Sequence, residues 1–192
     1  GVWDRVAAFQ ALERALAGGI DSAAAPALEQ AWPQMASAGL LVPFAELFAQ
    51  PLSKTALEGR AARMARRAAF LSPAYRRLAE GMRADDRETA FLRAIALGEA
   101  PDMSLPALPH AEAVAAAFAA DAEPPAGLAQ ALVEQSLGEI LLRAIALFSD
   151  GIAGNAPAMT EALATLRAVG LRDTARRAAI QAMLLDAERA RR

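Results

Sequence analysis

The sequence predicts an all-α fold, an array of short antiparallel helical hairpins forming an α-solenoid or superhelical bundle of roughly ten to twelve helices. More than a quarter of the residues are alanine, which has the best intrinsic helix propensity. Aromatic residues make up only 5% of the chain and β-branched residues are scarce, whereas a sheet is built mainly from these types. Apolar side chains recur at helical spacing between glycine and proline breaks.

In the N-terminal half, capping residues and helix breakers set the predicted boundaries. Gly18-Gly19 ends the first helix, Pro33 is expected to kink or split the second, and Ser53 is expected to cap the fourth. Pro43 suits the first turn of a helix that carries Phe44 and Phe48. The helices predicted here cover residues 4–16, 21–35, 43–48, 55–71, 73–82 and 86–97.

In the C-terminal half, Asp150-Gly151 is a stop signal and Asn155 a start signal, so the last two helices are expected to form a hairpin. The closing helix carries one apolar stripe, which consists of Ile180, Met183, Leu184 and Ala187. The helices predicted here cover residues 110–121, 128–135, 137–149, 156–169 and 173–189.

Residues 101–109 contain three prolines and are predicted to be a linker between an N-terminal part, 1–100, and a C-terminal part, 110–192. The six residues 92–97 recur unchanged as 142–147, which favours an internal repeat. Equivalence of the two copies predicts that Ile95 and Ile145 are both buried and that Arg93 and Arg143 both point outward. The pattern Leu137-Gly138-xx-Leu141-Leu142 before a second helix resembles one tetratricopeptide hairpin, but that family's aromatic and proline positions are mostly unmet.

Length and composition indicate a globular protein, with 192 residues, 55% apolar residues and a formal net charge of −2. Cysteine is absent, which excludes disulfides and thiolate metal sites, and no apolar run is long enough to span a membrane. Arginine and alanine bias favours a bacterial source. The chain starts at Gly1, as expected of a mature or trimmed protein without a visible signal peptide, so the compartment stays open between bacterial cytoplasm and periplasm.

No residue pattern predicts catalysis, a cofactor or a metal ion. His110, the only histidine, lies at a predicted helix start with no visible nucleophile or orienting group. Asp85, Asp86 and Glu88 are expected to cap a helix, because they lack the spacing of a calcium loop. The glycines of residues 150–155 are explained by helix termination, since the loop lacks the ending of a phosphate-binding loop.

One segment is strongly basic, with no acid between Glu58 and Glu80. Such a helix face suits phosphates, an anionic membrane or an acidic partner. The alternative, which we favour, is a solvated outer face whose arginines pair with acids from adjacent helices. The residues of this possible polyanion or partner contact are Arg60, Arg63, Arg66, Arg67, Arg76 and Arg77.

The large aromatic rings are expected to fill the core, although Trp3 and Trp32 would also suit a groove for a partner helix. We therefore predict a non-catalytic helical interaction or scaffold domain that binds another protein, as part of a larger bacterial protein or assembly. The alternatives are nucleic-acid or anionic-surface binding through residues 60–77, against which the net charge argues, and a carrier of a small apolar ligand.

Overall fold

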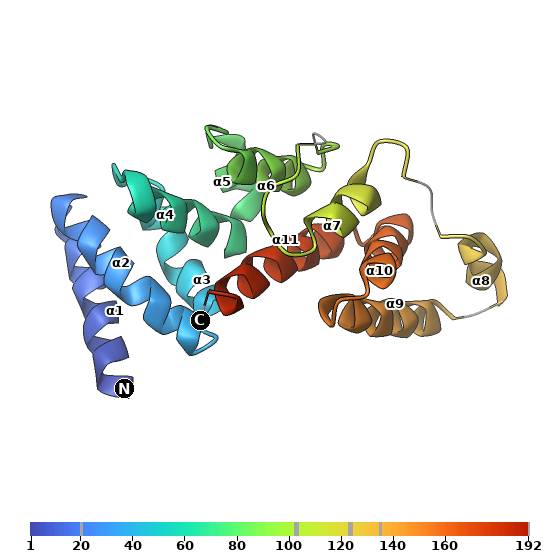
Figure 1. The fold of residues 1–192 in the computed structure, drawn as a ribbon, viewed down its shortest axis with the longest axis horizontal. Coiled ribbons are helices and arrows are strands. Elements are labelled where there is room, and N and C mark those ends of the chain that lie inside the picture. The colour runs from blue at the N-terminus through green and yellow to red at the C-terminus, as the bar shows by residue number, and fades with distance from the viewer. Residues whose placement is uncertain (20, 102–103, 123–124, 135, 192) are drawn as a thin grey trace. The chain divides into compact units, whose positions relative to one another are not determined.

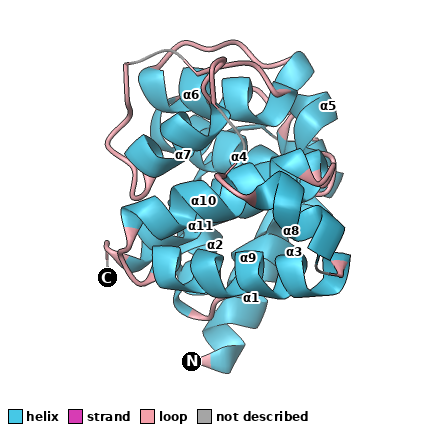
Figure 2. Cartoon of the chain, turned by 90° about the vertical axis from the view of Figure 1, so that its right-hand side faces the viewer, coloured by secondary structure: helices cyan, strands magenta, loops and turns pink. Residues whose placement is uncertain are grey.

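The computed structural model describes residues 1–19, 21–101, 104–122, 125–134 and 136–191. These residues contain eleven helices and no strand (Figures 1 and 2). The predicted all-α class is therefore confirmed. Among the helices of the described residues, none combines the length and the apolar character needed to cross a bilayer.

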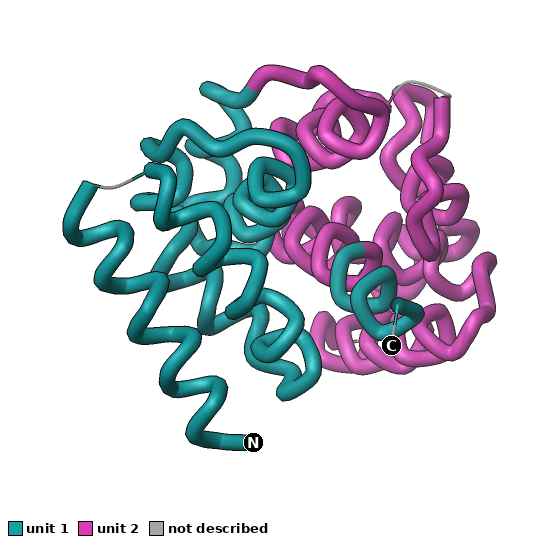
Figure 3. Tube along the Cα trace, turned by 60° about the vertical axis from the view of Figure 1, so that its left-hand side comes forward, with its two compact units in different colours: residues 1–82, 184–192 teal, residues 83–183 magenta. Residues whose placement is uncertain are grey.

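The chain divides into two compact units, which Figure 3 colours separately. Unit 1 consists of residues 1–82 together with 184–192, and unit 2 of residues 83–183. The proline-rich stretch 101–109 lies inside unit 2. The predicted linker at that stretch, between residues 1–100 and 110–192, stays a prediction, and its residues 102 and 103 lie outside the described residues.

Unit 1 is built from helix pairs joined by short turns. Helix α1 packs on α2 and α3 packs on α4, while α4 also contacts α2 and α5. The helices are α1 (Val2–Ala17), α2 (Asp21–Ser37), α3 (Leu41–Leu52), α4 (Gly59–Leu71) and α5 (Tyr75–Glu80).

Aromatic rings form the centre of unit 1, as predicted. Trp32 meets Phe44 edge to face with ring centroids 6.0 Å apart, and Phe48 lies 4.9 Å from both Phe44 and Phe9. Such contacts fill the volume that alanine leaves between helices. The core prediction is wrong for Trp3, whose side chain on α1 is 83% exposed.

Several predicted helix bounds in unit 1 differ from the structure: α1 begins at Val2 and α3 runs from Leu41 to Leu52. Helix α2 is not split at Pro33, because a proline inside a helix is tolerated where surrounding packing holds the segment. Helix α4 begins at Gly59 rather than near residue 55. Ser53 is the C-cap residue of α3, and its hydroxyl donates to the Gln50 carbonyl at 2.7 Å.

Unit 2 is organised around α10, which packs on both α9 and α7. Helix α11 begins in unit 2, and its last turns belong to unit 1. The helices that begin in this unit are α6 (Arg87–Leu97), α7 (Ala111–Phe118), α8 (Leu128–Glu134), α9 (Leu137–Ile152), α10 (Ala156–Ala168) and α11 (Arg172–Arg189).

Side-chain caps set two of these helix starts as predicted. The Asp86 carboxylate accepts the Thr89 amide at 2.8 Å, and the Asn155 side chain accepts the Ala158 amide at 3.2 Å. The predicted apolar stripe of α11 is also confirmed, since Ile180, Met183 and Leu184 are fully buried and Ala187 nearly so. Local sequence chemistry is therefore sufficient to place these elements.

Gly151 has a different role from the predicted one. It lies within α9, which ends at Ile152, and it is buried against α10. A Cβ at this position would be 2.7 Å from Met159 Cβ and 2.8 Å from Met159 Cα. Glycine is therefore required because two helix backbones approach closely here, and not because the helix stops.

The predicted repeat of residues 92–97 and 142–147 is wrong. Ile95 is fully buried, whereas Ile145 is 63% exposed. The two segments occupy different packing environments, and their similarity reflects the alanine- and arginine-rich composition. The solenoid prediction is met in part, since neighbours pair in α1–α2, α3–α4 and α9–α10, while α7 contacts the non-adjacent α10.

Candidate functional site

The structure separates the six arginines of the predicted basic segment. Arg60 and Arg63 on α4 are exposed, as are Arg76 and Arg77 on α5. None of these four forms an ion pair with a described residue. Arg66 is half-buried and lines a cavity of about 200 Å³ in unit 1. The predicted pairing with acids from adjacent helices is thus not found for the four exposed arginines.

Arg67 departs from the predicted basic face because it is buried. Its guanidinium donates from Nη1 to Glu188 Oε1, at the end of α11, and both side chains are less than a tenth exposed. Glu188 Oε1 also accepts a hydrogen bond from Arg191 Nη1 at 3.2 Å. Arg67 is a structural residue of unit 1 and belongs to no exposed polyanion surface.

The other residues singled out from the sequence form no chemical centre. His110 is the N-cap residue of α7 and has a left-handed backbone with φ of 61°. Asp86 caps α6, while Asp85 pairs with Arg83 at the surface. Within the described residues, no three His, Cys, Asp or Glu side chains lie close enough together to hold a metal ion.

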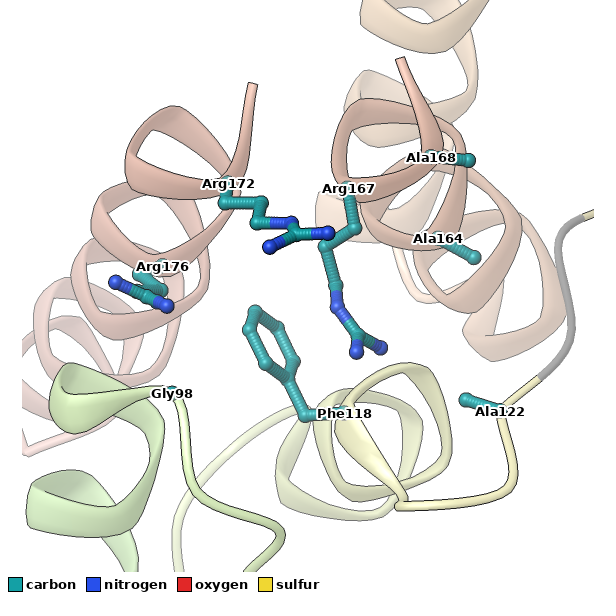
Figure 4. A pocket seen from close by; sticks show the side chains of 8 residues that line it. All are labelled: Gly98, Phe118, Ala122, Ala164, Arg167, Ala168, Arg172 and Arg176. Atoms are coloured by element: carbon teal, nitrogen blue, oxygen red, sulfur yellow. The ribbon is translucent and has the colours of Figure 1, made fainter. Parts of the chain in front are cut away.

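A cavity of about 380 Å³ in unit 2 brings three other arginines together (Figure 4). Arg167 comes from α10, and Arg172 and Arg176 come from the first turns of α11. The side chains of all three extend into the space between α10, α11 and the C-terminal end of α7. The remaining lining residues are Gly98, Phe118, Ala122, Ala164 and Ala168, so no described residue of the wall carries a carboxylate.

Arg167 is held in place by the end of α7. Its Nη1 donates to the Ala117 carbonyl, and its guanidinium carbon lies 4.9 Å from the centre of the Phe118 ring. A cation at a helix C-terminus satisfies an orphan carbonyl and interacts favourably with the helix dipole. Four residues back along α7, the Ala113 carbonyl accepts from the Thr160 hydroxyl at 3.1 Å. These two bonds fix α10 on α7 and orient Arg167.

Arg176 packs against the end of α6. Gly98 terminates that helix in the left-handed conformation, and a Cβ on Gly98 would overlap the Arg176 guanidinium. Gly98 therefore serves both the backbone turn and the close approach of the arginine.

The electrostatic environment of the cavity is positive. Burial lowers the pKa of the Arg167 guanidinium from its ordinary value, and the charges of Arg172 and Arg176 lower that pKa further. Arginine nevertheless remains protonated in proteins, so three cations face one space. Arg172 and Arg176 form no ion pair with any described residue. This arrangement is suited to an anion.

Sequence reasoning missed these three residues. Arg167 lies on a different helix from Arg172 and Arg176, and nothing in the spacing of residues 167–176 indicates that they enclose a cavity. The available signal was the absence of lysine and the excess of arginine in residues 167–177. That signal does not distinguish a cavity wall from a solvated surface.

Helix α9 presents an exposed apolar face on the side away from its packing partner. Ile140, Ala144 and Gly151 are buried, whereas Leu142 and Ile145 are 68% and 63% exposed. Leu142 and Ile145 are three residues apart and share one face of the helix. Helix α8, which contacts α9, also carries two exposed apolar side chains, Leu132 and Val133.

Comparison with known proteins adds no relative: the chain matches no protein-family model, no curated protein and no solved structure.

Proposed function

We propose that this protein is a non-catalytic helical interaction domain that binds another protein through the apolar face of α9, within a larger bacterial protein or assembly. The observation that carries the proposal is the exposure of Leu142 and Ile145 on a helix whose opposite side is already packed in the core. Contiguous exposed apolar side chains on a folded domain are typical of an interface.

The shape and energy of this face favour a protein as the ligand. A helix face is convex, so a small molecule would leave most of its own surface in water. An apolar groove or helix of a partner covers such a face completely. Burying each of these two side chains would contribute about 1.5–3 kcal/mol, which is a useful part of a micromolar affinity.

The proposal is tested by site-specific photo-crosslinking in cells that express the full-length protein. A benzophenone side chain in place of Ile145 is expected to give one discrete adduct with a second protein. The matched control replaces Leu47 on α3, whose exposure of 60% is almost the same. We expect no adduct from the control, because Leu47 lies outside the α9 face.

The crosslinked partner is then purified and titrated against the unmodified chain. The double change Leu142→Gln and Ile145→Gln is expected to weaken binding by about tenfold or more. Absence of an adduct at position 145, an adduct formed equally at position 47, or unchanged affinity of the double variant would refute the proposed interface.

A second candidate function is binding of nucleic acid or an anionic surface through the basic segment. It is favoured by the exposure of Arg60, Arg63, Arg76 and Arg77 without ion pairs to described residues. It is opposed by the net charge of −2. The third, an apolar-ligand carrier, gains no support from the cavities described, because arginine lines each of them.

A further inference from the structure

We propose that the cavity lined by Arg167, Arg172 and Arg176 binds a small organic molecule that carries a phosphoryl group. The proposal is independent of the protein-binding face, since it rests on different residues and a different ligand class.

The first support is uncompensated charge. Arg172 and Arg176 form no ion pair with a described residue, and the described wall has no carboxylate. The three arginines line one cavity, in which Arg172 extends toward Arg167, Arg167 extends toward the end of α7, and Arg176 lies beside Gly98 (Figure 4). The positive charges of Arg172 and Arg176 repel that of Arg167, and an anion bound among the three side chains would offset this repulsion.

The second support is the supply of hydrogen-bond donors. A guanidinium carries five N–H donors, and Arg167 uses one of them on the Ala117 carbonyl. Arg172 and Arg176 donate no hydrogen bond to a described residue. A phosphoryl group brings three acceptor oxygens and almost two negative charges, whereas a carboxylate brings two oxygens and one charge. Three arginines therefore match a phosphoryl group better, by bidentate pairing.

The third support is that the site is anchored and has an apolar wall. Arg167 is fixed by Ala117 and Phe118 before any ligand arrives, so little side-chain entropy is lost on binding. The Phe118 ring and the methyl groups of Ala164 and Ala168 line the same space. A volume of about 380 Å³ leaves room for an organic portion beside the phosphoryl group.

Isothermal titration calorimetry on the full chain tests the proposal with three probes: ribose 5-phosphate, inorganic phosphate and citrate. We expect saturable binding of ribose 5-phosphate, weaker binding of inorganic phosphate because it lacks the organic part, and the weakest binding for citrate. The double variant Arg172→Gln and Arg176→Gln is expected to lower the ribose 5-phosphate affinity by about tenfold or more.

The matched control is Arg177→Gln. Arg177 is the next residue on α11, is exposed and does not line the cavity. This variant is expected to change affinity by less than about twofold, since the Arg177 side chain lies outside the cavity wall and an exposed charge is screened by salt. Circular dichroism of each variant checks that helix content is retained.

A positional readout comes from the NMR signal of the Arg167 Nε–H, which is expected to shift on ligand addition in the wild type and in Arg177→Gln. The proposal is overturned by absence of saturable binding at about 1 mM probe, by equal loss of affinity in Arg177→Gln, or by tighter binding of citrate than of ribose 5-phosphate. Tighter binding of inorganic phosphate than of ribose 5-phosphate would indicate an ion site and refute the organic ligand.

Discussion

Arg67 and its neighbours on α4 illustrate how one residue type takes different roles at helical spacing. Arg60, Arg63 and Arg67 lie on one side of an ideal helix, yet Arg60 and Arg63 are exposed while Arg67 is buried beside Glu188. A buried guanidinium must have a carboxylate and hydrogen bonds, because its desolvation is costly. Removing the acid therefore takes an ion-pair partner away from a charge inside unit 1.

Glu188→Gln is expected to destabilise the protein by about 3 kcal/mol in chemical denaturation. The matched control is Glu161→Gln. Glu161 Oε1 lies 3.4 Å from Arg143 Nη2 in an ion pair whose two side chains are largely open to water. That change is expected to cost less than about 1 kcal/mol, because water screens the pair. Similar losses for the two variants would contradict the structural role of Glu188.

A compensating variant separates charge from packing. Replacing both partners, Arg67→Met with Glu188→Leu, is expected to recover most of the stability lost in Glu188→Gln, since apolar side chains of similar volume avoid the desolvation cost. Failure to recover would show that the site depends on further polar contacts of Arg67.

At the scale of helices, glycine positions in α9 decide how closely α10 can approach. Gly151 faces the Met159 backbone, whereas a Cβ on Gly138 would have only Ser136 Oγ nearby, at 3.8 Å. Replacing glycine by alanine is therefore expected to change the stability of the protein in opposite directions at the two ends of α9.

Gly151→Ala is expected to destabilise the protein by about 1–3 kcal/mol, because the new methyl group overlaps the backbone of α10 and pushes the helices apart. Gly138→Ala is expected to stabilise it by up to about 1 kcal/mol through helix propensity. Thermal unfolding followed by circular dichroism measures both. A neutral Gly151→Ala would mean that the α9–α10 pair adjusts without cost.

For the whole molecule, the balance between local and total charge decides whether the exposed arginines bind polyanions. Four arginines of residues 60–77 are exposed, but the chain carries a net charge of −2. Long-range attraction follows the total charge, while close contacts follow the local cluster.

We expect no salt-sensitive binding of duplex DNA at physiological ionic strength, as measured by fluorescence anisotropy against salt concentration. Four phosphate contacts would give a slope of about −3.6 in log K against log salt. The informative variant changes Arg60, Arg63, Arg76 and Arg77 to Gln and leaves the buried Arg67 intact. Binding with that slope, abolished in this variant, would establish the second candidate function in place of the first.

The helical class and most helix positions were predictable because they depend on neighbours in the chain. Alanine propensity, the caps at Asp86 and Asn155, and the stripe of α11 all act within a few residues. The predicted repeat of residues 92–97 and 142–147 was wrong because an identical sequence does not determine whether a residue is buried. Ile95 and Ile145 occupy the same position in the two identical segments, but Ile95 is buried and Ile145 is exposed.

The sequence by itself determined the class of the fold, the caps at Asp86 and Asn155 and the absence of cysteine chemistry, because these follow from composition and local spacing. Only the tertiary structure decided that Arg67 is buried, that Gly151 is a packing residue, and that Arg167, Arg172 and Arg176 share a cavity. The physical reason is that burial, close approach and charge clustering depend on which helix faces meet, and that pairing is a property of the folded chain.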